Sequence, residues 1–290
     1  TLSFKYPAAQ KLPKIIADSF DRTSLDKMTQ RSKVICTTVG PYSKYGSDLV
    51  ASCIEHATHY CDLTGESPFV KEMIERHHER AIQQKCRIVH FCGFDSIPSD
   101  IGTQMLQEEY MRQTQTYLDE VCFYMGPSKG GFSGGTIASM LHLFERLHDP
   151  KIRRTLGNPY SLDPKDGIKK PRVSDAVGLK YDKDIQKWIG PFIMAGTNTK
   201  AVRRSHALLK YPYGHHFRYQ EVMSMPNFLM ALGLTVGLTS FISLAAFPPT
   251  RKLLQKFFLP KPGEGPSEDL RENGYFVIYL IGKKNGQIVC

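Results

Sequence analysis

Three short segments of the sequence combine glycine with carboxylate, hydroxyl or phenol side chains, the groups that orient a ligand or move a proton. They are GPYSKYG at 40–46, DLTGES at 62–67 and GFDSIPSD at 93–100. Each one follows an apolar run that is typical of a buried strand. Ordinary turn chemistry explains any single segment, because short loops favour Gly, Pro, Asp and Ser. Three in succession at one edge of a sheet predict a shared site.

The candidate catalytic residues in these loops are Tyr42, Glu66 and Asp95. A phenol such as that of Tyr42 can orient a carboxamide or donate a proton, whereas a structural tyrosine only packs and makes one hydrogen bond. Glu66 and Asp95 stand shortly before Pro68 and Pro98, which suit the first turn of a helix. Capping of those helices is therefore the alternative to a role in the wall of a site.

The candidate cofactor contacts are Gly40 with Pro41, and Cys92 with Gly93. A residue without Cβ lets a dinucleotide approach the backbone closely, which makes Gly40 the best candidate. Cys92 has no His partner in a recognisable pattern, so a small buried filler is favoured over a nucleophile.

Short β-rich runs alternate with helical patterns over the first hundred residues, which is typical of parallel βαβ units. The pattern predicts strands at 14–17, 34–39, 59–63 and 87–92, and helices at about 24–30, at 47–56 and from Ser67 onwards. This is an α/β fold with part of a Rossmann-type parallel sheet. Its ligand is expected beyond the carboxyl ends of the strands.

A smaller α+β domain is expected from residue 118 to 290, after a Rossmann domain at 1–117. It begins with a strand at 117–125, a glycine-rich loop at 126–136 and an amphipathic helix at 137–148. The loop residues that open this helix lack a P-loop lysine, so we expect them to shape a substrate cleft. They are Ser133, Gly134, Gly135 and Thr136. The alternating run 275–281 and the Asn-Gly that follows it predict a hairpin.

The formal charge of +10 is spread over short basic clusters, with no basic helix and no aromatic RNA-binding motif, which argues against nucleic acid as a partner. The seven cysteines include no CxxC pair, which favours free thiols in a reducing compartment over a metal site. The first residues lack the pattern of a signal peptide, so we expect an intracellular protein that is not secreted.

The segment 226–247 contains no charged residue and is followed by Arg251, Lys252 and Lys256. It is just long enough to span a bilayer, and basic residues favour a cytoplasmic or interfacial flank. The alternatives are a buried helix and a hydrophobic surface that binds lipid or a second copy of the chain.

Five motifs together resemble the saccharopine-dehydrogenase-like oxidoreductases, and in particular their trans-acting enoyl reductase branch. They are VGPYSKYG (39–46), CDLTGES (61–67), HFCGFDSIPSD (90–100), GGFSGGT (130–136) and KPGEGPSE (261–268). The resemblance implies a Rossmann domain that binds NADP or NAD, and hydride transfer to an activated double bond or imine. It also implies a hydrophobic acyl substrate. By the same resemblance Asp18 approaches the adenine end of the cofactor; the alternative is that it caps the next helix.

The family's first strand and its GASGFTG-type loop have no counterpart among these 290 residues. We therefore expect weakened cofactor binding, an inactive chain on its own, and a sheet whose missing central strand leaves an apolar edge exposed. The competing hypothesis is a non-catalytic protein of a membrane or lipid-droplet surface that keeps the fold without a cofactor. Dimerisation through the second domain fits either hypothesis.

Overall fold

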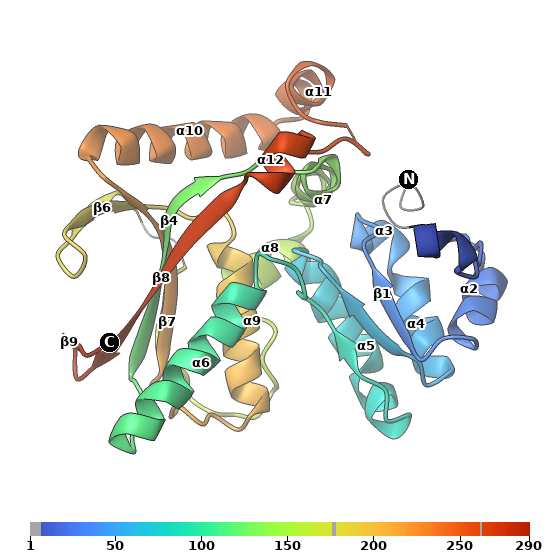
Figure 1. Ribbon diagram of the computed structural model, residues 1–290, viewed down its shortest axis with the longest axis horizontal. Helices are drawn as coiled ribbons and strands as arrows, with labels where there is room; N and C mark the ends of the chain where they lie inside the picture. Colours follow the sequence, from blue (N-terminus) through green and yellow to red (C-terminus); the bar gives the residue numbers. More distant parts are fainter. Residues whose placement is uncertain (1–6, 176–177, 262) are drawn as a thin grey trace.

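The computed structural model describes residues 7–175, 178–261 and 263–290, and Figure 1 shows two sheets side by side with helices around both. Sheet A is parallel, with the order β1-β2-β3. Its strands are β1 (Val34–Thr37), β2 (His59–Asp62) and β3 (Ile88–Val89). The predicted α/β fold with a partial parallel sheet is confirmed.

Four α-helices accompany sheet A after a 3-10 turn at Pro7–Lys11. They are α2 (Arg22–Thr29), α3 (Tyr42–Tyr45), α4 (Ser47–Glu55) and α5 (Ser67–Gln83). Helix α5 starts where Pro68 supplies a preformed first turn, and its buried face includes Phe69, Val70 and Met73. These side chains and those of α4 form one apolar core beside β2.

The strand predicted at 14–17 is wrong, because the described chain is irregular from residue 13 to 18. A strand needs a partner for its backbone groups, and β1 pairs only with β2 among the described residues. Ile16 is 96% exposed as a result. The other edge of β1 is unpaired in the described chain and exposes Val34, as the sequence predicts.

Sheet B has six strands in the order β5-β6-β7-β4-β8-β9. They are β4 (Glu120–Lys129), β5 (Lys180–Asp182), β6 (Lys187–Gly190), β7 (Arg218–Met225), β8 (Tyr275–Lys284) and β9 (Gln287–Ile288). Strand β4 pairs in parallel with β7 and antiparallel with β8. The predicted hairpin at the end is confirmed, and Asn285 and Gly286 take the positive φ values of its turn.

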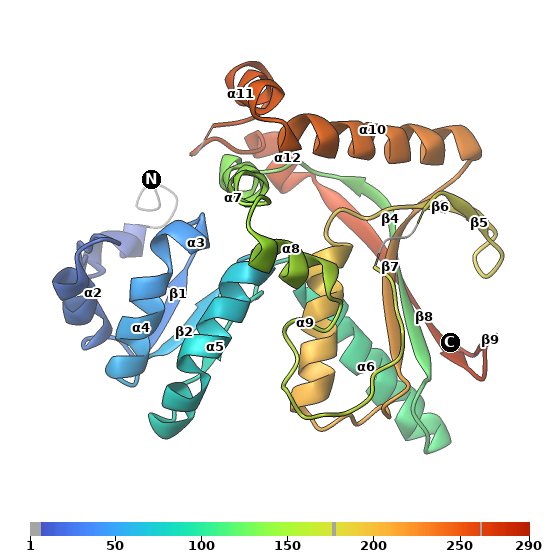
Figure 2. The same ribbon diagram turned by 180° about the vertical axis from the view of Figure 1, so that it is seen from behind.

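Helices cover both faces of sheet B. One face packs on α6 (Ile97–Thr114) and α9 (Ala195–Leu208), and α10 (Phe228–Ala246) runs along the other (Figures 1 and 2). The shorter helices are α7 (Gly134–Glu145), α8 (Pro150–Gly157), α11 (Pro248–Phe257) and α12 (Glu268–Glu272). Helix α6 contacts α9 and β8 although it precedes the predicted domain boundary at 117–118.

Candidate active site

The loops after β1, β2 and β3 leave sheet A at the same edge, as expected for parallel strands. Gly40 and Pro41 form a cis peptide in the first of these loops. A Cβ on Gly40 would lie 3.2 Å from Ser139 Oγ of α7, so the glycine allows α7 to come close to this turn. The structure thus brings the predicted cofactor turn and the helix of the predicted substrate cleft together (Figure 1).

The residues predicted to shape the substrate cleft form the start of α7. Ser133 caps the helix, and its Oγ accepts a hydrogen bond from Thr136 N at 3.2 Å. Gly134 N donates to Glu264 O at 2.9 Å, and Gly135 has open space around its α-carbon apart from the Ser133 side chain. This end of α7 is therefore held by the segment that contains Glu264, one of the five family-like motifs.

Glu66 is buried, and its carboxylate binds the first turn of α3. Its oxygens accept hydrogen bonds from Tyr42 N at 2.8 Å, from Ser43 N at 3.1 Å and from Ser43 Oγ at 2.5 Å. Capping was the expected alternative for Glu66, but of its own helix, and no cap bond to α5 forms. The geometry gives Glu66 a positioning role for the Tyr42 loop.

The phenol of Tyr42 points into the protein rather than into an open site. The side chain is 4% exposed, and its Oη donates to Thr37 O at 3.1 Å. Burial, together with the nearby Asp62 carboxylate, raises the pKa of Tyr42 to about 12. These contacts are those of a structural tyrosine. The phenol proton is already donated to Thr37 O and does not point towards a substrate.

The loop after β3 carries Cys92, Gly93 and Asp95. Cys92 N donates to Asp62 O at 2.7 Å, and burial is the main cause that raises the pKa of the Cys92 thiol. A protonated thiol fits the predicted filler role rather than a nucleophile. A Cβ on Gly93 would lie 2.9 Å from Leu63 Cβ, so this glycine allows two of the loops to touch.

Asp95 is half-buried, and burial raises the pKa of its carboxyl group. No hydrogen bond to its carboxylate is found within the described ranges. A carboxyl group with a raised pKa and no partner keeps its proton to a higher pH than an exposed carboxyl group, which makes it a candidate general acid. Of the three predicted catalytic side chains, Asp95 alone has that combination in this structure.

Asp18 lies in a turn before α2. Its Oδ1 accepts from Phe20 N at 2.9 Å, whereas Asp21 is the residue that caps α2. The capping role expected as the alternative for Asp18 therefore belongs to Asp21. Its cofactor role stays a prediction.

The sequence did not reveal the buried pair of Asp62 and His90. His90 Nδ1 lies 2.6 Å from Asp62 Oδ2, and Tyr60 Oη donates to the same oxygen at 2.9 Å. The side chain of Asp62 is fully buried and that of His90 is 7% exposed. Asp62 begins DLTGES and His90 ends an apolar run, so neither position indicates the other.

The described residues contain no group of three or more His, Cys, Asp or Glu side chains that could hold a metal ion. All seven cysteines are free thiols. One helix of the described chain, α10, is long and apolar enough to cross a membrane by length and composition alone.

No family model matches the sequence. A Mycobacterium tuberculosis protein (strain H37Rv) provisionally named a trans-acting enoyl reductase is 40% identical over 284 residues. A second protein of that strain, named trans-acting enoyl reductase, is 35% identical over 287 residues, and one of Mycobacterium leprae with this name is 33% identical over 291 residues. Each match covers 93% of this chain and 68% of the relative.

Among solved structures, apo saccharopine dehydrogenase (L-Glu forming) of Saccharomyces cerevisiae is 16% identical, with a TM-score of 0.33. The match covers 44% of this chain and 29% of the yeast chain. This likeness is too small to define a shared fold. The sequence relatives confirm the resemblance to trans-acting enoyl reductases that the loop motifs predict.

Proposed function

Because the chain belongs to the trans-acting enoyl reductase family, we propose that it takes part in reducing the carbon–carbon double bond of a hydrophobic enoyl substrate, with NADPH or NADH as hydride donor. The observation that carries the proposal is similarity over 93% of the chain to these reductases, which includes all three loops at the edge of sheet A. Hydride from the nicotinamide would reach the carbon β to the carbonyl, and a proton would complete the product at the α-carbon.

The residues at the sheet edge fit the nicotinamide end of such a cofactor better than its pyrophosphate. At Gly40 the Cβ space is taken up by Ser139 Oγ and the Tyr42 ring, whereas Gly65 of the next loop has only the tip of Met194 within 4 Å and leaves its backbone open. Cys92 and Gly93 follow the third strand at the same edge. The GASGFTG-type loop that would hold the pyrophosphate is not among these residues.

We assign the proton-donating role to Asp95. Its carboxyl group has no partner among the described residues, and burial raises its pKa, which favours the protonated form that a proton donor needs. Glu66 holds the Tyr42 loop by its three hydrogen bonds, and Tyr42 fills the core beneath that loop.

Nicotinamide binding is measured by the fluorescence of NADPH and NADH, with the purified chain and with a chain extended upstream by a βαβ unit that carries a GASGFTG-type loop. We expect strong binding by the extended form and weak or no binding by the 290 residues alone. Binding by neither form would contradict the reductase function. Comparison of the affinities for NADPH and NADH shows which of the two nucleotides the protein prefers.

The role of Asp95 is tested with Asp95→Asn in the form that binds cofactor, with an enoyl thioester as substrate. Loss of a general acid lowers kcat by about 10²- to 10⁴-fold, and KM should change little. Glu79→Gln, an exposed substitution on α5, is the control that keeps kcat. An unchanged kcat in Asp95→Asn would remove Asp95 from the mechanism.

A second proposed property is attachment to a lipid surface through α10 and α11. Helix α10 is apolar all round, yet only Ala231 and Ala245 of its 19 residues are fully buried. A helix with apolar residues on every side normally has all sides covered. Its outward side chains include Leu229 at 75% and Val236 at 55% exposure. This exposed face favours lipid over a purely internal role.

Contacts of α10 with sheet B support an arrangement in which it lies along a lipid surface. Phe228 stacks edge-on against Trp188 of β6 at 4.9 Å, and Thr235 Oγ1 would be 3.1 Å from a Cβ on Gly190. Helix α11 adds exposed Phe257 together with basic residues that suit anionic lipid heads. Those residues are Lys252 and Lys256.

Flotation with vesicles of anionic and of zwitterionic lipid tests this attachment. Leu229→Lys with Val236→Lys should abolish flotation, since both side chains face outward and their change leaves the contact with sheet B intact. Phe20→Lys, an exposed apolar position near α2, is the control. Unchanged flotation in the double variant would reject the proposal, and concentration-dependent dimers that the same variant dissociates would assign α10 to a homodimer instead.

A reducing intracellular compartment, in the cytoplasm or on such a membrane or lipid-droplet surface, is the location that we propose. It suits a reductase and seven free thiols, of which Cys53, Cys86 and Cys122 are buried.

A further inference from the structure

A cavity of about 440 Å³ lies beside the free edge of β3, between α5, α9 and the start of α6. It is separate from the turn at Gly40 and Pro41, which is two strands away and does not line it. Its size is in the range of small-molecule sites, about 300–1,000 Å³. Neither the nicotinamide nor the cleft at α7 accounts for it.

Apolar side chains from each surrounding element form the mouth of this cavity. Ile82 of α5 is 58% exposed, Val89 of β3 47%, Ile101 of α6 44% and Leu208 of α9 50%. Single exposed apolar residues are common on protein surfaces, but four around one hollow are typical of a ligand site. The walls are therefore suited to a hydrocarbon chain.

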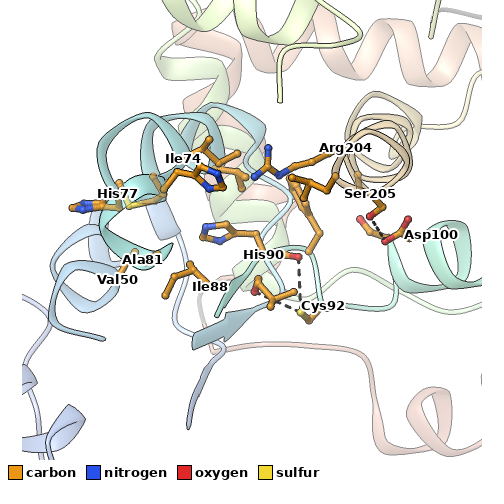
Figure 3. Close-up of a pocket in the computed structure, with 18 of the residues that line it drawn as sticks. Val50, Ile74, His77, Ala81, Ile88, His90, Cys92, Asp100, Arg204 and Ser205 are labelled. Carbon is orange, nitrogen blue, oxygen red and sulfur yellow. Dashed lines mark hydrogen bonds between the residues drawn. The ribbon is translucent and has the colours of Figure 1, made fainter. Parts of the chain in front are cut away.

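His90 supplies a fixed polar group inside the cavity, and Figure 3 shows its ring among the lining side chains. Its Nδ1 is bound to the buried Asp62 carboxylate at 2.6 Å, which sets the orientation of the ring. Within the described ranges no hydrogen-bond partner is found for Nε2. The His90 side chain as a whole is 7% exposed. Nε2 is open to the cavity, where a ligand or water can reach it.

Arg204 of α9 supplies a permanent positive charge on the same cavity. One terminal nitrogen donates to Leu162 O, and no ion pair of its guanidinium is found among the described residues. Asp163 is near, but its Oδ2 binds Lys170 at 2.9 Å. The remaining N–H groups of Arg204 are thus available to an anion, for which a planar guanidinium is well suited.

Asp100 is the only acidic side chain among the described lining residues. Its Oδ2 accepts a hydrogen bond from Ser205 Oγ at 2.7 Å. The cavity therefore combines the guanidinium of Arg204, and a carboxylate that already has a hydrogen-bond donor, with an apolar mouth.

We propose that this cavity binds an amphipathic carboxylic acid of medium chain length. The carboxylate pairs with Arg204, beside the ring of His90 that Asp62 holds in place. The hydrocarbon chain lies along Ile101 and Leu208 towards solvent. This site goes beyond the proposed reductase function, because Arg204, Ile101 and Leu208, which hold the ligand, have no part in that function, although Cys92 of the loop after β3 lies in the cavity wall.

Isothermal titration of the whole chain with decanoate, below its micelle concentration, and with decanol tests the site. Arg204→Met should weaken decanoate binding by about 10-fold, equal to ~1.4 kcal/mol, while decanol binding changes less than about 2-fold. Arg204→Lys keeps the charge and should restore most of the decanoate affinity. Equal losses for decanoate and decanol in Arg204→Met would refute the carboxylate contact.

The apolar mouth is tested with Leu208→Trp, which should weaken both ligands by about 10-fold. Leu209→Trp is the matched control, because Leu209 is exposed to a similar extent and does not line the cavity. If Leu208→Trp fails to fold, Ile82→Trp blocks the opposite wall. No decanoate binding at about 1 mM by folded protein, or equal effects of the 208 and 209 variants, overturns the proposal. Decanoate should not displace NADPH, so this result is independent of the reductase test.

Discussion

At the scale of single residues, the carboxyl group of Glu221 makes the clearest pH prediction. It is wholly buried and accepts hydrogen bonds from Tyr219 Oη at 2.7 Å and from Asn198 Nδ2 at 2.9 Å. Burial raises its pKa from 4.5 to about 7. The folded state then binds a proton that the unfolded state has released, so the free energy of unfolding falls as the pH rises from about 4.5 through 7.

Glu221→Gln removes this titration, and the comparison with the natural chain isolates it. Each unit of pKa shift corresponds to about 1.36 kcal/mol. Between about pH 4.5 and 8, the unfolding free energy of the natural chain should therefore fall by up to ~3 kcal/mol relative to that of Glu221→Gln. Urea unfolding across this range measures it. Glu79→Gln, at an exposed site, should give a difference that does not vary with pH.

Glu66 makes a prediction of stability. In Glu66→Ala, the amides of Tyr42 and Ser43 lose their acceptor inside the protein, which costs about 2–3 kcal/mol of unfolding free energy. Glu66→Gln keeps one acceptor oxygen, so its free energy of unfolding should fall by less than that of Glu66→Ala. Urea unfolding gives both values, and the exposed substitution Glu75→Gln serves as reference. A loss below about 0.5 kcal/mol in Glu66→Ala would show that α3 does not depend on this carboxylate.

The sequence predicts single residues well where the signal is local. The Gly, Pro and carboxylate pattern of the loops located Gly40, Glu66 and Asp95 at one sheet edge. It did not predict which partner each carboxylate takes, since Glu66 binds a helix 24 residues away in sequence. The contact of His90 with Asp62 was missed for the same reason, because it depends on the pairing of β2 with β3.

At the scale of elements, apolar runs predicted β1 and β2 and the proline-led start of α5, because burial and local turn chemistry act together there. The run at 14–17 has the composition of a strand but gains no partner in the described chain. Strand propensity is a preference for a half-buried pleated surface, and Ile16 has no such surface. Helix α7 starts at Gly134, earlier than the predicted 137, because the Ser133 cap allows three more helical residues.

The junction of α3 and α4 at Gly46 gives a prediction for an element. A Cβ at this position would lie 2.8 Å from both Phe69 Cζ and the backbone oxygen of Tyr42. Gly46→Ala should therefore cost about 1–3 kcal/mol of unfolding free energy. Gly196→Ala, in α9 with nothing within 4 Å, should be neutral or stabilising by up to about 1 kcal/mol. Thermal unfolding compares the stabilities of the two variants. Equal changes in stability would mean that the junction of α3 and α4 shifts to make room for the added Cβ.

At the scale of the whole molecule, polar contacts join the two sheets through the start of α6 and α9. Ser96 Oγ donates to Asn198 Oδ1 at 2.9 Å, and Asn198 in turn reaches Glu221 of β7. Thr197 Oγ1 also donates to Gly65 O in the loop after β2 at 3.1 Å. The loop that carries Asp95 is thereby fixed to sheet B, so stability of the second sheet determines geometry at the edge of the first.

Asn198→Ala should separate the unfolding of the two sheets. It removes the partner of Ser96 and one of the partners of Glu221, which keeps its bond from Tyr219 Oη, at a cost of about 2 kcal/mol. This loss is shared by both sheets only while they remain joined. Trp188, the single tryptophan, reports on sheet B, and hydrogen exchange of β1 and β2 reports on sheet A. We expect coincident transitions in the natural chain and distinct ones in the variant. Coincident transitions in both would assign the coupling to apolar packing, and Ser205→Ala, which loses only its bond to Asp100, is the control that should remain cooperative.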